Sequence, residues 1–77
     1  MFYVYLIRIS KTGNTYIGST NNLRRRLQEH KEKIPELIYY EAYKDERDAR
    51  EREKKLKQRG QAVRRLKERL KHSLSST

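Results

Sequence analysis

The segment Phe2–Ile9 (FYVYLIRI) decides the fold, because a strand that is apolar on both alternating faces is usually central in its sheet and covered on both sides. Its two faces carry Phe2, Val4 and Leu6 on one side and Tyr3, Tyr5, Ile7 and Ile9 on the other. We therefore expect a central strand over residues 2–9 with other elements packed against each face.

A short turn and a returning strand follow this segment. Lys11–Asn14 (KTGN) has the composition of a turn, and Thr15–Ser19 (TYIGS) reads as the returning strand. With Gly13 and Asn14 at the centre of the turn, the numbers of facing residues sum to 27. Tyr5 and Tyr16 then project from the same face, whereas a slip of one residue would separate them.

The chain beyond this hairpin is charged and helical. Thr20, Asn21 and Asn22 are capping residues for a helix over 23–33 (LRRRLQEHKEK). Leu23 and Leu27 define the apolar stripe of this helix, with His30 close to it. Around the stripe lie three arginines: Arg24 and Arg26 flank it, and Arg25 points away.

Pro35 ends this helical pattern, and Glu36–Tyr43 (ELIYYEAY) predicts a third strand. A polar helix is expected over Asp45–Arg59, where Glu53 lies between the only two apolar residues, Ala49 and Leu56. A second, amphipathic helix is expected over Gln61–Leu74, with its apolar face formed by Val63, Leu66, Leu70 and Leu74.

The length and the charge of the chain limit the classes of function it can have. The 77 residues allow one domain, and 20 Lys and Arg against 10 Asp and Glu give a net charge of +10. Such a balance favours a polyanionic partner, first nucleic acid and second an anionic membrane surface. The absence of cysteine excludes disulfide scaffolds and thiolate metal sites. No apolar run is long enough to span a membrane, so we expect a soluble, cytoplasmic protein.

Polar residues at positions where apolar ones would serve are the candidates for chemistry: Tyr5, Tyr16, Arg26, His30 and Glu53. They offer a phenol, a fixed cation, an imidazole and a carboxylate, which suffice for metal-assisted phosphodiester hydrolysis if they converge on one sheet face. Each residue alone also has a structural explanation, such as a core tyrosine or a solvated arginine. The pattern by itself therefore indicates a basic β-plus-α domain that binds nucleic acid.

Three ordered motifs resemble those of the GIY-YIG nuclease family: Tyr3-Val4-Tyr5, Tyr16-Ile17-Gly18, and Asn22–Leu27 followed by Glu29-His30. Later segments are similar to the family's small stand-alone bacterial members, often called excinuclease-like after an excision-repair subunit: Leu37–Tyr43, Arg52-Glu53 and Arg64–Leu74. The resemblance covers nearly the whole chain. It implies one domain over residues 1–74, followed by a frayed tail at 75–77.

The resemblance implies an α+β fold, with a small three-stranded antiparallel sheet flanked by about three helices. It also implies metal-dependent cleavage of DNA, for which we expect Mg²⁺ or Mn²⁺. Because the chain shows no separate recognition domain, we expect little sequence preference and a substrate set by DNA structure, such as branched or damaged DNA. Tyr5 and Tyr16 fall on the positions of the general base or water-positioning group. Arg26 falls on the residue that stabilises the transition state, His30 on a proton-transfer helper, and Glu53 on the metal ligand.

Four further basic residues are candidates for nucleic-acid contact: Arg24, Arg25, Lys31 and Lys33. The chain also departs from the family pattern. Its first motif is Tyr-Val-Tyr rather than Gly-Ile-Tyr, only Lys31–Pro35 joins the first helix to the third strand, and its asparagines all lie early. Two alternatives therefore stay open: a non-catalytic nucleic-acid-binding module on the same fold, and a basic domain that binds an acidic protein.

Overall fold

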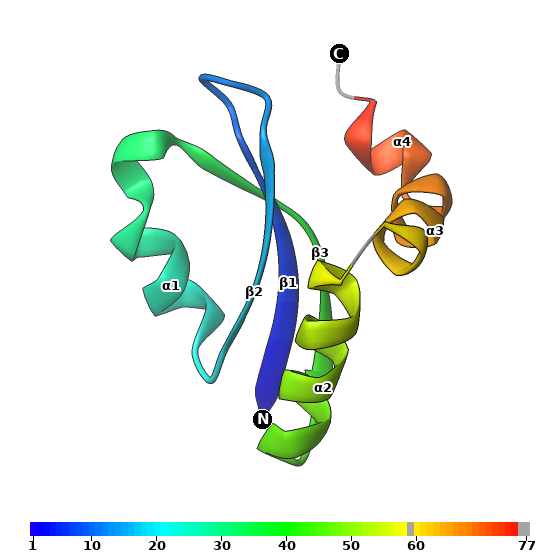
Figure 1. Ribbon diagram of the computed structural model, residues 1–77. Coiled ribbons are helices and arrows are strands. Elements are labelled where there is room, and N and C mark those ends of the chain that lie inside the picture. The colour runs from blue at the N-terminus through cyan, green and yellow to red at the C-terminus, as the bar shows by residue number, and fades with distance from the viewer. Residues whose placement is uncertain (59, 76–77) are drawn as a thin grey trace.

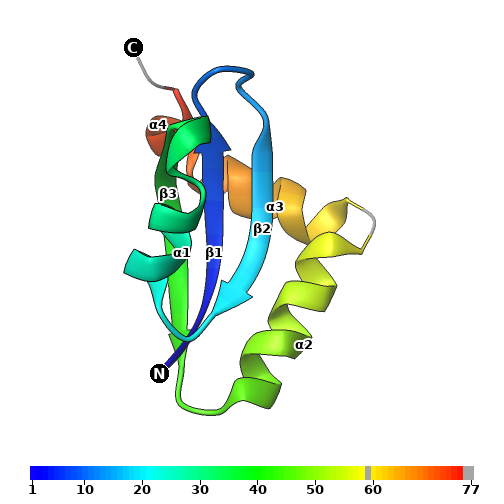
Figure 2. The same cartoon turned by 90° about the vertical axis from the view of Figure 1, so that its left-hand side faces the viewer.

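The computed structural model describes residues 1–58 and 60–75, and at its centre is a three-stranded antiparallel sheet. The strands β1 (Phe2–Ile9), β2 (Thr15–Thr20) and β3 (Pro35–Tyr43) lie in the order β2-β1-β3 (Figure 2). The apolar segment is therefore the central strand, as its pattern predicted. Of the tail expected to fray over 75–77, Ser76 and Thr77 lie outside the described residues, and the N–H of Ser75 donates to the Lys71 carbonyl at 2.9 Å.

Helices cover both faces of the sheet (Figure 1). The helix α1 (Leu23–Glu29) and a short 3₁₀ turn (Lys31–Lys33) cover one face, while α2 (Glu46–Lys57) and α3 (Gln61–Arg69) cover the other. A last helical turn, α4 (Lys71–Leu74), follows α3. The α+β architecture matches the expectation. Within the described part of the chain, no helix is both long and apolar enough to cross a membrane.

The core divides into two layers, one on each face of β1. Val4 packs with Ala49, Leu56 and Leu66 on the face covered by α2 and α3. On the opposite face Tyr5, Ile7 and Ile9 pack against the side covered by α1, where Leu23 and Leu27 contact them. These two layers explain why a strand in so polar a chain is apolar on both faces.

The predicted register of the first hairpin is wrong by four residues. Tyr5 faces Gly18 and Ile7 faces Tyr16, so the numbers of facing residues sum to 23. The connecting loop is longer than a two-residue turn: the N–H of Ile9 donates to the Asn14 carbonyl at 2.8 Å, and Gly13 has a φ of 76°. Because a shift of four is even, Tyr5 and Tyr16 still project from the same face.

The first helix is shorter than predicted. Asn22 is its N-cap, and the Asn22 side chain accepts a hydrogen bond from the N–H of Arg25. The helix ends at Glu29 rather than Lys33, because residues 31–33 tighten into a 3₁₀ turn and Ile34 adopts a left-handed φ of 52°. This reversal leads directly into β3, which begins at Pro35.

The two later helices also differ from the sequence pattern. The helix α2 begins at Glu46 with Asp45 as its N-cap and ends at Lys57, while Arg59 lies outside the described residues. The single helix expected over 61–74 is two helices, because Leu70 leaves helical geometry with φ −104° and ψ 20°. Beyond this break, the carbonyl of Leu74 accepts a hydrogen bond from Arg8 of β1.

Candidate functional site

Tyr5 lies against the backbone of Gly18. The Tyr5 side chain is buried, with 5% of the residue exposed, and its partner on β2 is Gly18. A Cβ placed on Gly18 would come within 2.3 Å of the Tyr5 Oη atom. Glycine is thus required at position 18 for space, since any side chain would displace the phenol.

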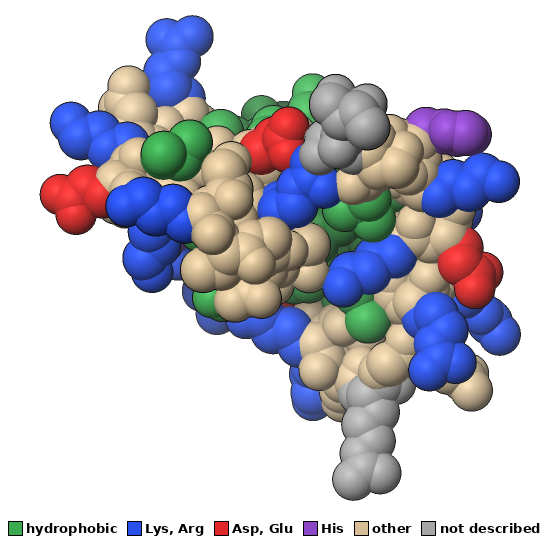
Figure 3. All heavy atoms as spheres, turned by 90° about the horizontal axis from the view of Figure 1, so that it is seen from above, with side chains coloured by type: hydrophobic (Ala, Val, Ile, Leu, Met, Phe, Trp, Pro, Cys, Tyr) green, Lys and Arg blue, Asp and Glu red, His purple; other side chains and the backbone are tan. Residues whose placement is uncertain are grey.

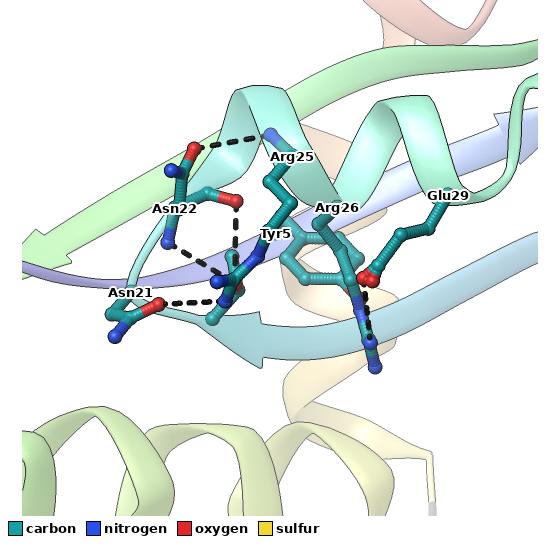
Figure 4. A network of polar contacts seen from close by, with 7 residues as sticks. Tyr5, Asn21, Asn22, Arg25, Arg26 and Glu29 are labelled. Carbon is teal, nitrogen blue, oxygen red and sulfur yellow. Dashed lines mark hydrogen bonds and ion pairs between the residues drawn. The ribbon is translucent and has the colours of Figure 1, made fainter.

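The Tyr5 hydroxyl is tied to helix α1 through Arg26. Arg26 donates a hydrogen bond from Nε to the Tyr5 hydroxyl at 3.1 Å. This hydrogen bond is the main cause of the raised pKa of Arg26. Glu29 lies 3.8 Å from the Arg26 Nη1 atom, a loose ion pair at the surface (Figure 4). Tyr5 and Arg26 therefore form a fixed unit in which the guanidinium end remains accessible to a ligand.

A pocket of about 280 Å³ lies beside this unit, between α1, the end of β2 and α2. Figure 4 shows the side chains of Arg25 and Arg26 extending from α1 toward β2. The polar lining of the pocket consists of Ser19, Thr20, Asn21, Arg25, Arg26, Glu46 and Arg50. We call this the arginine pocket. Three guanidinium groups against one carboxylate make it a suitable site for an anionic group such as a phosphate.

Glu53 approaches β2 from the opposite face of the sheet. Ser19 donates from Oγ to the Glu53 Oε1 atom at 2.6 Å, and Lys57 pairs with Oε2 at 2.8 Å. Ser19 faces Val4 and therefore points to the side covered by α2, whereas Tyr5 points to the side covered by α1. The condition that all the candidates converge on one sheet face is therefore not met, because Glu53 contacts β2 from the α2 side while Tyr5 lies on the α1 side.

The two sides of the site meet around the edge of β2, which is an outer strand. Ser19, which bonds Glu53, lines the same pocket as Arg26, and the Glu53 carboxylate contributes, after Tyr5 and Glu29, to the raised pKa of Arg26. Burial opposes ionisation of Glu53, but the hydrogen bonds from Lys57 and Ser19 outweigh it and lower the carboxyl pKa. The site thus presents an ionised carboxylate on one side of the strand edge and a guanidinium on the other.

The donor set at Glu53 fits a hard divalent cation. Among the described residues, no group of three or more His, Cys, Asp and Glu side chains gathers as a ready-made metal site. Mg²⁺ commonly binds through one or two carboxylates and completes its shell with water and substrate phosphate oxygens. Glu53 and the Ser19 hydroxyl supply such oxygens. Lys57 is half exposed and flexible enough to give up its contact with the carboxylate.

Tyr16 and His30 share a second pocket on the α1 face. Tyr16 is 50% exposed, and it lines a pocket of about 180 Å³ together with His30, Lys33 and part of Tyr5. His30 is held there as the C-cap of α1, where its N–H donates to the carbonyl of Leu27 at 3.2 Å. The structure therefore brings the two tyrosines and the histidine to one side of the sheet, and Tyr5 links them to Arg26.

The residues predicted to contact nucleic acid are all exposed, as are many other basic side chains. Arg25 is oriented by Asn21, whose Oδ1 atom accepts a hydrogen bond from Arg25 at 3.1 Å. Lys31 and Lys33 lie on the 3₁₀ turn after α1, and Arg24 is an exposed residue of the first turn of α1. Figure 3 looks down on the end of the molecule with the β1–β2 turn and shows basic side chains spread widely over it.

Three residues of the site were missed in the sequence: Ser19, Arg50 and Lys57. Lys57 follows Glu53 by four positions, which is the spacing of an ion pair along a helix, so its contact was predictable. Ser19 directly follows Gly18, and strand alternation alone would have placed it on the α2 side. Arg50 had no such signal, because its place in the arginine pocket depends on how α2 packs against β2.

The fold and site define a small basic domain that positions a tyrosine, an arginine and a glutamate around the edge of a three-stranded sheet. The family model described as the GIY-YIG catalytic domain matches residues 1–69, so the chain belongs to the GIY-YIG family. This membership places it in a nuclease superfamily that acts on nucleic acid and generally depends on a divalent metal. Neither the curated proteins nor the solved structures include a significant match to the chain.

Proposed function

We propose that this domain hydrolyses DNA phosphodiester bonds with Mg²⁺ or Mn²⁺ and with little sequence preference. The observation that carries the proposal is the Tyr5–Arg26 hydrogen bond of 3.1 Å, held over Gly18 beside the arginine pocket. An arginine that is fixed by Nε and exposed at its other end is prepared to bind a phosphate. A domain that only attracted DNA nonspecifically would not need an arginine bonded to a buried phenol.

Arg26 stabilises the transition state in this proposal. Its terminal N–H groups donate to the nonbridging oxygens of the scissile phosphate, where negative charge increases during attack. The anchor at Nε keeps the guanidinium in place, so little reorganisation is needed during the reaction. Arg25 and Arg50 add positive charge on either side of the same pocket.

The two phenols and the imidazole orient the attacking water and accept its proton. The Tyr5 oxygen accepts from Arg26, and its remaining hydrogen-bonding capacity is directed to the water or to the phosphate. Tyr16 and His30 line the neighbouring pocket, where one orients the water and the other accepts a proton. Glu53 and the Ser19 hydroxyl would hold a divalent cation, which would neutralise charge at the phosphate and lower the pKa of bound water.

Low sequence specificity follows from the kind of contact the site offers. The arginine pocket and the exposed basic residues are suited to phosphate oxygens, and phosphate contacts carry no direct sequence information. We propose DNA structure, rather than base sequence, as the property that selects the substrate.

The decisive experiment is a nicking assay on supercoiled plasmid with Mg²⁺, Mn²⁺ or EDTA, comparing the wild type with Glu53→Gln. Glu51→Gln is the matched control, because Glu51 lies on the same helix, is exposed and carries the same charge. We expect metal-dependent nicking by the wild type and by the control, and none by Glu53→Gln. Absence of nicking by the wild type across metals and branched, gapped or duplex DNA would reject the proposal.

A non-catalytic nucleic-acid-binding module is the second candidate, and the ion pair between Lys57 and Glu53 at 2.8 Å favours it. In that case Lys57 neutralises the carboxylate permanently. Glu53→Gln would then leave DNA binding unchanged or strengthen it, with no change in any catalytic readout. Binding of either kind should weaken steeply with salt, because phosphate contacts release counterions. Full competition by bulk DNA would argue against an acidic protein as the partner.

A further inference from the structure

An aromatic pair, of which Tyr40 is exposed and Tyr3 is partly buried, lies on the α1 face of the sheet, outside the catalytic candidates. Tyr40 of β3 is 52% exposed, and its ring meets that of Tyr3 edge to face, with centroids 5.9 Å apart and an interplanar angle of 67°. The neighbouring Tyr39 and Tyr43 instead donate their hydroxyls to Glu41. Tyr40 thus leaves an aromatic surface available to a ligand.

This pair forms part of a pocket of about 330 Å³ whose other walls are polar. The pocket is lined by Tyr3, Asn21, Asn22, Leu23, Arg24 and Tyr40. It combines aromatic rings with side-chain amides and one guanidinium. Aromatic faces and guanidinium planes stack on planar heterocycles, while amides pair with their donor and acceptor edges.

The aromatic pocket adjoins the arginine pocket. Asn21 lines both, and Arg25, whose guanidinium donates to Asn21 at 3.1 Å, lies on the arginine side of that boundary. Arg24 and Arg25 are consecutive, so one helix presents a cation to each pocket. A nucleic-acid strand has the matching layout, with a phosphate next to a base along its length.

We propose that the pocket of Tyr3, Tyr40 and Arg24 binds an unpaired nucleobase of the strand whose phosphate occupies the arginine pocket. The inference rests on the proposed nucleic-acid substrate and specifies its structure. A base within a duplex has its faces covered by its neighbours, so only a flipped or single-stranded base can stack on Tyr40. The domain therefore selects DNA with a gap, flap or bubble over fully paired DNA.

The test measures binding without cleavage, in EDTA. A DNA duplex with a single-stranded flap carrying 2-aminopurine is titrated with the wild type, Tyr40→Ala and Tyr40→Phe, and a flush duplex of equal length serves as the control DNA. We expect the wild type to quench the 2-aminopurine. Tyr40→Ala should weaken flap binding roughly 5- to 50-fold, with flush-duplex binding changed less than about twofold. Tyr40→Phe, which keeps the ring, should bind like the wild type.

Three results would overturn the inference: equal affinity of the wild type for flap and flush DNA, no quenching, or an equal loss on both DNAs in Tyr40→Ala. Circular dichroism of Tyr40→Ala verifies that its fold is retained, and Arg24→Gln provides a second variant, which should lose more affinity for the flap DNA than for the flush duplex. Because no bond is broken in EDTA, the result is independent of nuclease activity. Flap binding that depends on Tyr40 in a protein that never nicks DNA would reject the proposed nuclease and support this subsite.

Discussion

Two glutamates on the α2 side of the sheet have similar burial but opposite surroundings. The Glu41 side chain is 15% exposed and that of Glu53 is 22% exposed. Glu41 accepts hydrogen bonds from the hydroxyls of Tyr39 and Tyr43, and Arg52 donates to it from Nε at 3.0 Å and Nη2 at 3.0 Å. Glu53 contacts a serine hydroxyl and the end of one flexible lysine.

The difference separates a structural carboxylate from one available to a ligand. The partners of Glu41 are planar or rigid groups from β3 and α2, and they fill its acceptor positions. The ion pair with Arg52 joins the strand to the helix one residue before Glu53 and so helps to fix where Glu53 lies. Glu53 itself can exchange Lys57 for a cation at little cost, because Lys57 is half exposed.

The largest expected effect is on cleavage, and of the two glutamates only Glu53 should show it. Glu53→Gln should lower the nicking rate by about 100-fold or more, because a neutral amide is a poor ligand for a divalent cation. Its free energy of unfolding should change by less than about 1 kcal/mol, as expected for an ion pair whose lysine is half exposed. Nicking rates and urea titrations of the same preparations check both. A large loss of stability would show that Glu53 is a structural residue like Glu41.

The reverse pattern is expected at Glu41. Glu41→Gln removes the charge that Arg52, Tyr39 and Tyr43 all bind, and should lower the free energy of unfolding by about 2–3 kcal/mol. Urea denaturation followed by circular dichroism measures the change. At temperatures where the variant is still folded, its nicking rate should stay within about fivefold of the wild type. An unchanged stability would contradict the structural role assigned to Glu41.

Gly18→Ala tests the other half of the site, where Tyr5 lies. The new Cβ would lie 2.3 Å from the Tyr5 Oη atom and 2.5 Å from Cζ, so the ring must move and its hydrogen bond with Arg26 must break. We expect a loss of about 1–3 kcal/mol in stability and about tenfold or more in nicking rate. In a Tyr5→Leu background the added stability cost of Gly18→Ala should shrink, which a double-mutant cycle measures. An undiminished cost would show that the alanine clashes with something other than the phenol.

The sequence predicted the central strand, the helix cap at Asn22 and the shared face of Tyr5 and Tyr16, because each depends on a local pattern of residue type and spacing. It could not predict the length of the β1–β2 loop, since Gly13 permits more than one turn geometry. The sequence also could not predict that Glu53 lies across the edge of β2 from Tyr5. The helical pattern showed that Glu53 faces the sheet, but not which face of the sheet receives the helix.

The Glu41 cluster, which consists of Glu41, Tyr39, Tyr43 and Arg52, could not be predicted from the sequence either. Glu41, Tyr39 and Tyr43 alternate along one strand, which indicates a common face, but Arg52 comes from a helix whose rotation is set by the packing of Ala49 and Leu56. The same packing decides that Arg52 turns toward β3 while Glu53 turns toward β2. Arg52 and Glu53 are adjacent on α2, but their different roles depend on tertiary contacts that the local spacing of residues does not predict.

The smallest expected effect is an alkaline decline in stability that belongs to the Glu41 cluster and not to Glu53. Burial, followed by the hydrogen bond to Glu41, raises the pKa of Tyr43 to about 12. The unfolded chain loses this proton near pH 10 while the folded protein keeps it, so the free energy of unfolding contributed by Tyr43 falls between about pH 10 and 12. We expect a fall of about 1 kcal/mol, reduced by solvent screening from the value for a fully buried group.

The measurement compares urea midpoints across this pH range in the wild type and three variants. Tyr43→Phe removes the titrating group and Glu41→Gln removes the carboxylate that helps to raise its pKa, so both should decline less than the wild type. Glu53→Gln should decline as steeply as the wild type, since Glu53 is bonded to Ser19 and Lys57 rather than to a tyrosine. If Glu53→Gln flattened the curve as much as Glu41→Gln, the two carboxylates would belong to one coupled network. Their separation into a structural and a ligand-binding group would then be wrong.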